Sequence, residues 1–409
     1  MLAQAVSAAA GSVPFQTTGP IQALSLVRSY QIPSDDPSAA RLANLSWTYD
    51  SAVTAVAFEE TGNVAQAQQL LDQLKALQRT DGSIDFAFNT ATGQSIPEFR
   101  TGTIAWTGLA AADYRAATCS SSYDAVAYGA AKWLLSEQLV SPSAPAFGLI
   151  RGGPDVTWVS TQHDLIARAF LAHLADAIDG NLRHGSEGRG NGNGPSCPGG
   201  LSGLTGPQAS AFSAQLHHAV ALLDAGISAE LYVRLTPGTA AQSGIAYFKE
   251  GVGDDVRPAD AQALGALWLL SQGRTQDAQA VVNYANQSML VSNRSVALSA
   301  NPLTYNETYS SPGPFSGYLP YADPGTPSVL WLEGTLEMRF AEHALGDDTS
   351  TLDRSIVGWQ GITGFSTGPL QADKTVVGNI FNEYHPWPDS AAAAWELLNL
   401  TSFSLLSTS

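Results

Sequence analysis

The stretch Ser328-Val-Leu-Trp-Leu-Glu-Gly-Thr335 is the clearest organising motif of the chain. It opens an apolar segment that continues to about Leu345, and the spacing of its apolar residues predicts a helix. Glu333 would then lie in the first turn of that helix, close behind Trp331. An acid at this place can simply stabilise the helix dipole, so a functional interpretation needs further support.

Five other segments share this construction: each is a short polar and aromatic cluster that runs straight into a helix of small apolar residues. The clusters are Trp47–Asp50, Glu98–Gly102, Thr157–Asp164, Asp254–Asp260 and Glu383–Asp389. Helices that are apolar nearly all round are expected to be buried on both sides. The sequence therefore predicts six buried helices with polar clusters at their starts, the last of them covering Asp389–Leu405.

Amphipathic stretches alternate with these segments and predict a second set of helices, each with one side facing solvent. They cover Ile21–Tyr30, Asn63–Arg79, Tyr123–Gln138, Pro207–Ala225, Thr275–Met289 and Asp348–Gly361. Twelve helices of two alternating kinds are the pattern of an all-α (α/α)6 toroid, with an inner ring and an outer ring. All inner helices then point the same way, so the polar clusters should line a single cleft at one end.

Shorter features complete the expected architecture. Residues 84–90 and 231–248 alternate apolar and polar positions, which predicts short β segments in the loops. Residues 1–20, rich in Ala and Ser, are expected to form an N-terminal extension, and residues 21–409 one toroidal domain. Closed toroids routinely reach this length as single domains.

The charge balance narrows the choice of partner. With 36 acidic and 19 basic side chains the net charge is −17, which argues against nucleic acid and anionic membranes. The sequence carries no fingerprint of a nucleotide, NAD, serine-hydrolase or zinc-protease site, so no cofactor is expected. The acidic turn at Asp254-Asp255 fits no EF-hand loop and is expected to be solvated, followed by Asp260 as a helix N-cap. A monomer is expected.

Several features favour an extracellular protein. Only 13% of residues are charged, and five N-x-S/T sequons begin at Asn44, Asn286, Asn293, Asn306 and Asn399, so we expect secretion and glycosylation of some of these sites. The chain start lacks the basic and apolar regions of a full signal peptide, which favours a mature chain. Cys119 and Cys197 both follow inner helices, so they fall on one rim, where a disulfide would hold the glycine-rich loop 180–206.

Four motifs, together with the alternation of the two kinds of helix, make the chain similar to a known superfamily. They are Thr80-Asp-Gly-Ser83 before an aromatic segment, Arg100-Thr-Gly102 before Trp106, Gly152-Gly-Pro-Asp155 with Trp158-Val-Ser-Thr161, and Trp331-Leu-Glu-Gly-Thr335. From about Ile21 to Leu405 the chain resembles the six-hairpin glycosidase superfamily, whose members are secreted (α/α)6 enzymes acting on carbohydrates. The resemblance implies a carbohydrate substrate but leaves the reaction open, because this superfamily includes hydrolases, lyases and sugar epimerases.

Glycoside hydrolysis needs two carboxylates, one protonated to assist the leaving group and one ionised to activate water or attack carbon. The clusters offer many, and crowding of like charges would raise one pKa to suit a general acid. We expect Glu333 to be this acid and Asp50 to be the base, or a ligand of a sugar hydroxyl; as an alternative, Asp50 is an N-cap. Asp164 is a weaker catalytic candidate, because Ser160 or Thr161 could cap its helix and leave Asp164 paired with Arg168.

Other cluster residues are expected to bind the sugar, the tryptophans by stacking on its faces. These are Tyr49, Glu98, Arg100, Trp106, Asp155, Trp158, His163, Asp260, Trp331, Glu383, His385 and Trp387. Two alternatives remain open. A polysaccharide lyase would use His163 or Tyr384 as base, with Arg100 or Arg257 neutralising a uronate. A carbohydrate-binding toroid would keep the tryptophans without chemistry. We favour an inverting hydrolase of a neutral glycan.

Overall fold

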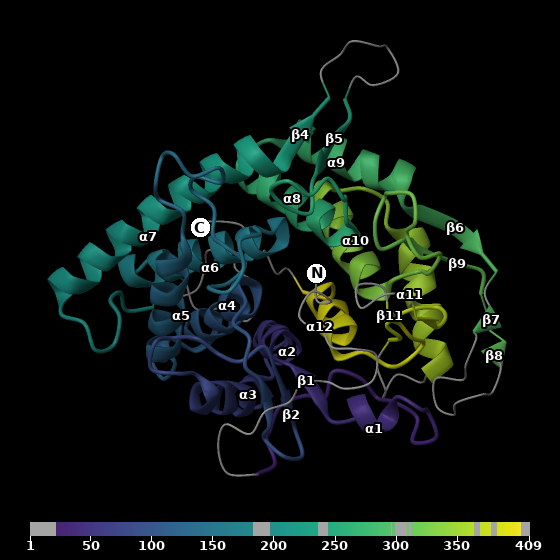
Figure 1. Cartoon of the computed structure of the whole chain (residues 1–409), viewed down its shortest axis with the longest axis horizontal. Helices are drawn as coiled ribbons and strands as arrows, with labels where there is room; N and C mark the ends of the chain where they lie inside the picture. Colours follow the sequence, from purple (N-terminus) through teal and green to yellow (C-terminus); the bar gives the residue numbers. More distant parts are fainter. Residues whose placement is uncertain are drawn as a thin grey trace.

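The structure is a computed structural model that describes residues 22–182, 197–235, 244–295, 297–298, 309–310, 313–363, 369–377 and 383–401. It confirms the (α/α)6 toroid, with inner helices around a common centre and outer helices around them (Figure 1). The inner helices are α2 (Thr48–Glu60), α4 (Thr101–Thr118), α6 (Thr161–Asp179), α8 (Ala259–Ser271), α10 (Leu332–Leu345) and α12 (Ser390–Leu398). The outer helices are α3 (Val64–Leu77), α5 (Asp124–Glu137), α7 (Gly206–Gly226), α9 (Thr275–Ser288) and α11 (Ser350–Thr363).

The first expected outer helix, Ile21–Tyr30, is wrong. Residues 22–28 run without regular secondary structure, and the four-residue α1 (Ala39–Leu42) is the only described helix before α2. Leu24 and Leu26 are buried while Ser25 between them is exposed, so the apolar side chains alternate with a period of two and suit an extended chain. The segment lies along the N-terminal half instead, with the Leu24 N–H donating to Thr90 O at 2.8 Å.

The last inner helix is shorter than expected. The sequence predicts it to run to Leu405, but α12 ends at Leu398, and residues 402–405 lie outside the described part of the chain. The remaining helix predictions differ from the structure by a few residues at their ends.

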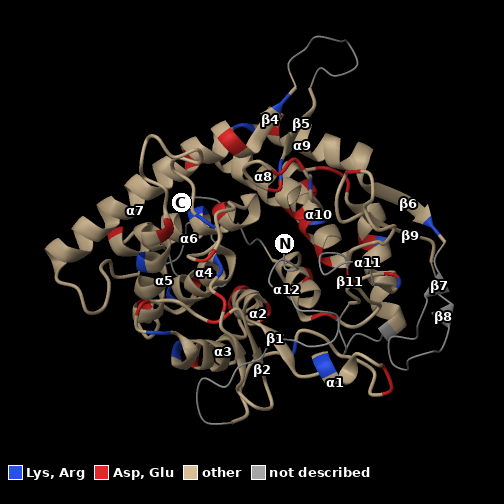
Figure 2. Cartoon of the chain, viewed as in Figure 1, with Lys and Arg blue, Asp and Glu red and all other residues tan. Residues whose placement is uncertain are grey.

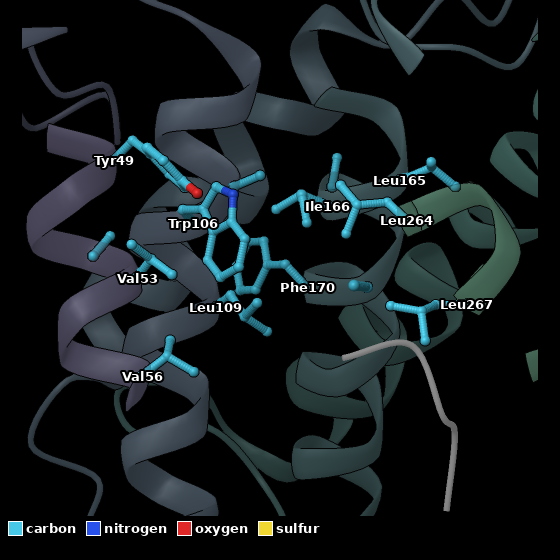
Figure 3. Packing of buried hydrophobic residues seen from close by; sticks show 14 of the residues in the cluster. Tyr49, Val53, Val56, Trp106, Leu109, Leu165, Ile166, Phe170, Leu264 and Leu267 are labelled. Carbon is cyan, nitrogen blue, oxygen red and sulfur yellow. The ribbon is translucent and has the colours of Figure 1, made fainter. Parts of the chain in front are cut away.

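The inner ring is a closed circle. Each inner helix packs against the next inner helix along the chain, and α12 packs against α2. The helices are buried almost all round: every residue of α4 from Thr101 to Arg115 is buried. Close approach of α4 and α6 explains the small residues, because a Cβ atom on Gly108 would lie only 2.4 Å from Cε1 of Phe170. Figure 3 shows Phe170 packed beside Trp106 and Leu109 in this core.

A repeated backbone hydrogen bond joins the helix starts around the whole ring. The first residue of each inner helix donates its N–H to a carbonyl in the loop that leads to the next inner helix. The six bonds are Thr48 to Phe86 (3.1 Å), Thr101 to Gly152 (3.0 Å), Thr161 to Glu250 (2.9 Å), Ala259 to Pro320 (2.9 Å), Leu332 to Gln371 (2.9 Å) and Ser390 to Ser29 (3.0 Å). Because the last bond returns to the segment before α2, the N-terminal ends of all six inner helices are held together at one rim.

Short antiparallel strands lie in the loops. The first sheet joins β1 (Leu45–Trp47), β2 (Ala87–Asn89) and β3 (Ser95–Ile96), in the order β1-β2-β3. The two-stranded pairs are β4 (Tyr232–Arg234) with β5 (Ala246–Phe248), β6 (Leu290–Arg294) with β9 (Phe315–Tyr318), β7 (Ala297–Leu298) with β8 (Tyr309–Ser310), and β10 (Val376–Val377) with β11 (Glu383–Tyr384). Strand β2 lies within the expected β segment 84–90, and the pair of β4 with β5 lies within the expected segment 231–248, so both predictions are confirmed. Among the described residues, no helix has the length and apolar character needed to cross a membrane.

Candidate active site

Glu333 lies in the first turn of α10, at the rim where the inner helices begin, and its side chain is buried. The hydroxyl of Tyr49, from the first turn of α2, donates to Glu333 Oε1 at 2.7 Å. The indole N–H of Trp395, on α12, donates to the Tyr49 hydroxyl oxygen at 2.9 Å. Three inner helices therefore position one carboxyl group.

The surroundings of Glu333 favour its protonated form. Burial raises the pKa of Glu333 well above its ordinary value, and the charges of Asp389, Asp50 and Asp260 raise it further. The hydrogen bond from Tyr49 acts in the opposite direction and is outweighed. Figure 2 marks acidic residues in red on α2 and α10, beside the middle of the ring. The geometry thus gives a buried carboxylic acid among other carboxylates.

Asp50 and Asp389 form a second acidic pair where α12 meets α2. Asp50 is buried in the first turn of α2, and Ser390 Oγ donates to its Oδ2 at 3.4 Å. The N-cap of α2 is Trp47, so the N-cap interpretation of Asp50 is wrong. Burial and then the charge of Asp389 raise the pKa of Asp50.

Asp389 is the N-cap of α12 and accepts the N–H of Ala392 through Oδ1 at 3.0 Å. Burial raises the pKa of Asp389 to about 6, while the backbone N–H groups of Ala391 and Ala392 stabilise its charge. Of the two acids, Asp389 is therefore the one that holds the negative charge of the pair near neutral pH.

A third group of acids lies at the start of α8. Asp260 is buried in the first turn, and its Oδ1 accepts the N–H of Ala261 at 2.7 Å. The N-cap of α8 is Pro258, so the predicted N-cap role of Asp260 is wrong. Burial raises the pKa of Glu250 to about 7, helped by the charges of Asp260 and Asp254. Glu337, one turn beyond Glu333, is buried, and burial together with the charges of Glu333 and Asp260 raises its pKa.

Arg100 is engaged within the rim. Its guanidinium is buried and bonds Glu98 Oε2 at 2.7 Å and Asp155 Oδ1 at 2.7 Å. Arg257 is paired with Asp323 through its side chain. The two arginines that the sequence offers for a uronate therefore each have a carboxylate partner of their own.

The predicted stacking residues divide into two sets. Trp106 is 3% exposed and packs against the rings of Tyr49 and Trp395, and Trp387 is 2% exposed and stacks on His385 at 3.6 Å. Both are too enclosed to receive a sugar face. Trp158 and Trp331 are only partly buried, so they keep surface that a ligand could reach.

The two histidines lie in different environments. Burial, with the charge of Arg100, lowers the pKa of His163 to about 3, so its imidazole is neutral; its ring lies 5.5 Å from that of Trp158. His385 bonds Glu383 Oε1 at 3.0 Å, and Arg41 bonds the same oxygen at 3.0 Å. Glu383 is thus held by both His385 and Arg41.

Asp164 has a structural contact. Its Oδ1 accepts the N–H of Ile150 at 2.9 Å, and the side chain is completely buried. The hydroxyl of Ser160 caps α6, as the alternative interpretation expected. The expected pairing with Arg168 is wrong, because Arg168 bonds Asp224 at 3.0 Å.

The expected modification sites are also placed. Cys119 and Cys197 form a disulfide with an S–S distance of 2.01 Å. Asn44 and Asn293 are exposed. Asn286 accepts a hydrogen bond from Tyr318, and Asn399 donates to Leu336 O at 3.1 Å and to Trp395 O at 2.7 Å. Asn306 lies outside the described residues.

Sequence reasoning missed Asp389, Glu337, Glu250 and Trp395. Asp389 ends the quoted cluster before the last inner helix, so its place at a helix start was a usable signal. Trp395 had none, because its partner Tyr49 is 346 residues away in the sequence.

Comparison with known proteins supports the fold. No protein-family model and no curated protein sequence matches the chain. Among solved structures, a wild-type glycosidase is 13% identical with a TM-score of 0.55, covering 93% of this chain and 91% of that one. A bacterial glucoamylase complexed with acarbose is 13% identical with a TM-score of 0.57, covering 89% of this chain and 50% of that one. A D-mannose isomerase is 10% identical with a TM-score of 0.50, covering 92% of each chain. At these identities the likeness is one of fold: the chain has the toroidal architecture of glycosidases and of at least one sugar isomerase.

Proposed function

We propose that this protein is a glycoside hydrolase and that Glu333 is its general acid. The observation that carries the proposal is the environment of Glu333: a buried carboxyl group at the rim of the toroid, held by Tyr49, whose pKa the charges of Asp389, Asp50 and Asp260 raise. A general acid must keep its proton near neutral pH and release it to a leaving group. Burial and neighbouring charge act together in this direction.

The second carboxylate is the Asp50–Asp389 pair. Two buried acids whose charges act on each other ionise one after the other, so the pair carries one negative charge over a range of pH. Backbone N–H groups at the start of α12 place this charge on Asp389. In the proposed mechanism the pair acts as the base that the sequence assigns to Asp50, and it takes a proton from water as that water attacks the anomeric carbon, with inversion. Glu333 meanwhile protonates the departing glycosidic oxygen.

The charges at the rim favour a neutral substrate. The negative charge that the Asp50–Asp389 pair holds would repel an anionic sugar, and both Arg100 and Arg257 are already paired with acids. A lyase needs a cation to neutralise the uronate carboxylate. This pairing disfavours the lyase alternative.

We further propose that the protein is secreted as a glycoprotein and acts as a monomer. The disulfide and the exposed sequons at Asn44 and Asn293 support secretion.

The function is tested with a panel of neutral and acidic glycans, following reducing-end release, ultraviolet absorbance and binding for the wild type and Glu333→Gln. Glu396→Gln on α12 is the matched control, because it makes the same chemical change on an inner helix at an acid that does not act on Glu333. We expect release from a neutral glycan by the wild type and the control alone. Unsaturated products absorbing in the ultraviolet would show a lyase, and binding without turnover a carbohydrate-binding protein.

A further inference from the structure

Trp395 is the buried end of a hydrogen-bond chain that leads to Glu333. The indole N–H of Trp395 lies 2.9 Å from the Tyr49 hydroxyl oxygen, and that hydroxyl lies 2.7 Å from Glu333 Oε1. Trp395 is fully buried, at 0% exposure, and Tyr49 is also buried. The three residues come from α12, α2 and α10.

The direction of this chain follows from the chemistry of its members. An indole N–H can only donate, so the Tyr49 oxygen accepts from Trp395. Tyr49 has a single hydrogen, and the bond to Glu333 uses it. Glu333 Oε1 is therefore an acceptor in both protonation states, and the acid proton must reside on Oε2.

We propose that Trp395 is a positioning residue, which acts through Tyr49 to place the acid proton of Glu333 on Oε2. This inference rests on the proposed function, since a fixed proton matters only if Glu333 donates one. Without Trp395, the Tyr49 hydroxyl could turn and accept a proton from Oε1. In a fraction of the molecules the proton would then lie on Oε1, which faces Tyr49. These molecules would not have it on Oε2, from which Glu333 donates it to the leaving group.

Aromatic packing holds the chain in place. The ring of Trp395 meets Trp106 edge-on at 6.0 Å and Phe340 at 6.0 Å, and Trp106 meets Tyr49 at 5.5 Å. These contacts fix both ring planes, so the two hydrogen bonds are preorganised before any substrate arrives. Preorganised geometry is what a general acid needs, because small displacements are costly to catalysis.

The direction in which the pKa of Glu333 changes in a variant depends on all the groups that face Glu333. They are Asp50 and Tyr49 on α2, Asp260 on α8, Glu337 on α10, Asp389 at the start of α12, and Tyr30 and Tyr384 on the adjoining segments. Asp50, Asp260 and Asp389 raise the pKa of Glu333, and Glu333 in turn raises the pKa of Glu337. The hydrogen bond from Tyr49 lowers the pKa of Glu333. Loss of that bond must therefore raise the pKa of Glu333.

The test follows the carboxyl infrared band of Glu333 against pH, with the band identified by its loss in Glu333→Gln. Tyr49→Phe removes the bond to Oε1, and Trp395→Phe keeps an aromatic ring but removes the indole donor. We expect Tyr49→Phe to raise the pKa of Glu333 by about one unit, the effect of one hydrogen bond. Trp395→Phe should raise it in the same direction, and the double variant should go no further than Tyr49→Phe.

Turnover gives a second readout. Trp395→Phe should lower kcat by roughly three- to ten-fold with little change in KM, well short of the loss of a hundred-fold or more expected without a general acid. Phe340→Leu is the control for packing, because it perturbs the same ring without touching a hydrogen bond of the chain. It should lower the thermal stability and leave the pKa of Glu333 unchanged.

Other outcomes would refute the role of Trp395 or the hydrolase function, each independently of the other. If Trp395→Phe leaves the pKa of Glu333 at the wild-type value, or if its effect adds to that of Tyr49→Phe, Trp395 has no positioning role. If the infrared shifts appear but no glycan is cut, the hydrogen-bond chain stands and the hydrolase function fails. If Trp395→Phe does not fold, NMR of the wild type replaces it. The chemical shift of the Trp395 indole N–H should then change as Glu333 titrates. A chemical shift that stays constant over this pH range would refute the hydrogen-bond chain.

Discussion

The backbone N–H of Ser390 donates to the carbonyl oxygen of Ser29 at 3.0 Å, and this bond closes the circle of six that joins the inner helices. It brings the start of α12 to the segment before α2, and with it Asp389 to Asp50. The contact that closes the ring therefore also brings the two acids of the pair together.

Ser29→Ala should destabilise the protein. The Ser29 hydroxyl oxygen accepts the buried N–H of Trp47 at 2.8 Å, so its loss leaves that donor without a partner. We expect a loss of about 1–3 kcal/mol in the free energy of unfolding. Chemical denaturation measures it, with Ser25→Ala on the same segment as control, since Ser25 is exposed. Equal stability of the two variants would refute the role of Ser29.

The pH dependence of activity should follow two carboxyl groups. Asp389 has a raised pKa of about 6, so the charge of the acidic pair and the activity should fall as the pH drops below that value. Glu333 has a pKa well above its ordinary value, so the activity should persist at neutral pH and fall only when Glu333 ionises. A kcat profile against pH tests both limbs. Asp389→Asn should remove the acidic limb along with most of the activity, and an unchanged acidic limb in this variant would exclude Asp389.

Stability should be greatest at mildly acidic pH. Glu250 and Glu396 have raised pKa values of about 7, and burial raises those of Asp50, Glu333 and Glu337 as well. In the unfolded chain these groups titrate near pH 4, so above that pH the folded state binds more protons than the unfolded state. Stability then falls as the pH rises from about 4 and levels off above the folded pKa values. Thermal unfolding at several pH values measures this, and a Tm that rises from pH 5 to pH 7 would contradict the account.

Glycosylation should distinguish exposed sequons from packed ones. Asn44 and Asn293 can carry a glycan without disturbing the fold, because both side chains are exposed. Asn399 uses its amide to hold the carbonyls of Leu336 and Trp395, so a glycan there is incompatible with the folded ring. Peptide mass spectrometry of protein secreted from a eukaryotic host should find the first two occupied and Asn399 bare. Occupancy of Asn399 in folded protein would contradict the packing of α12.

The sequence predicts the ring and its acidic rim because both rest on local patterns. The six polar clusters and the small-residue helices after them are visible residue by residue, and the same pattern predicts the place of Glu333. The sequence wrongly predicts a helix before α2, because Leu24, Leu26 and Val27 fit a helix as well as an extended chain when no partner is known. Backbone hydrogen bonds to Thr90 and Thr92 decide in favour of the extended chain.

The surroundings of the site residues could not be predicted, because they depend on contacts between residues far apart in the sequence. Arg100 looked available for a substrate carboxylate, and its partner Asp155 lies 55 residues further on. The stacking role expected for Trp106 depends on exposure, which the packing of Tyr49 and Trp395 removes. The sequence predicts a role for Asp50, but the neighbour whose charge raises its pKa, Asp389, comes from the other end of the chain.

The most direct test of the central claim compares Glu333→Gln with the wild type on two substrates that share one sugar and differ in leaving group. One is the neutral glycan cut in the panel, and the other is the corresponding glycosyl fluoride, whose leaving group needs little protonation. If Glu333 is the general acid, the variant should lose about a hundred-fold or more in kcat on the glycan and retain most of its activity on the fluoride. Equal loss on both substrates, or no loss on the glycan, would contradict the role assigned to Glu333.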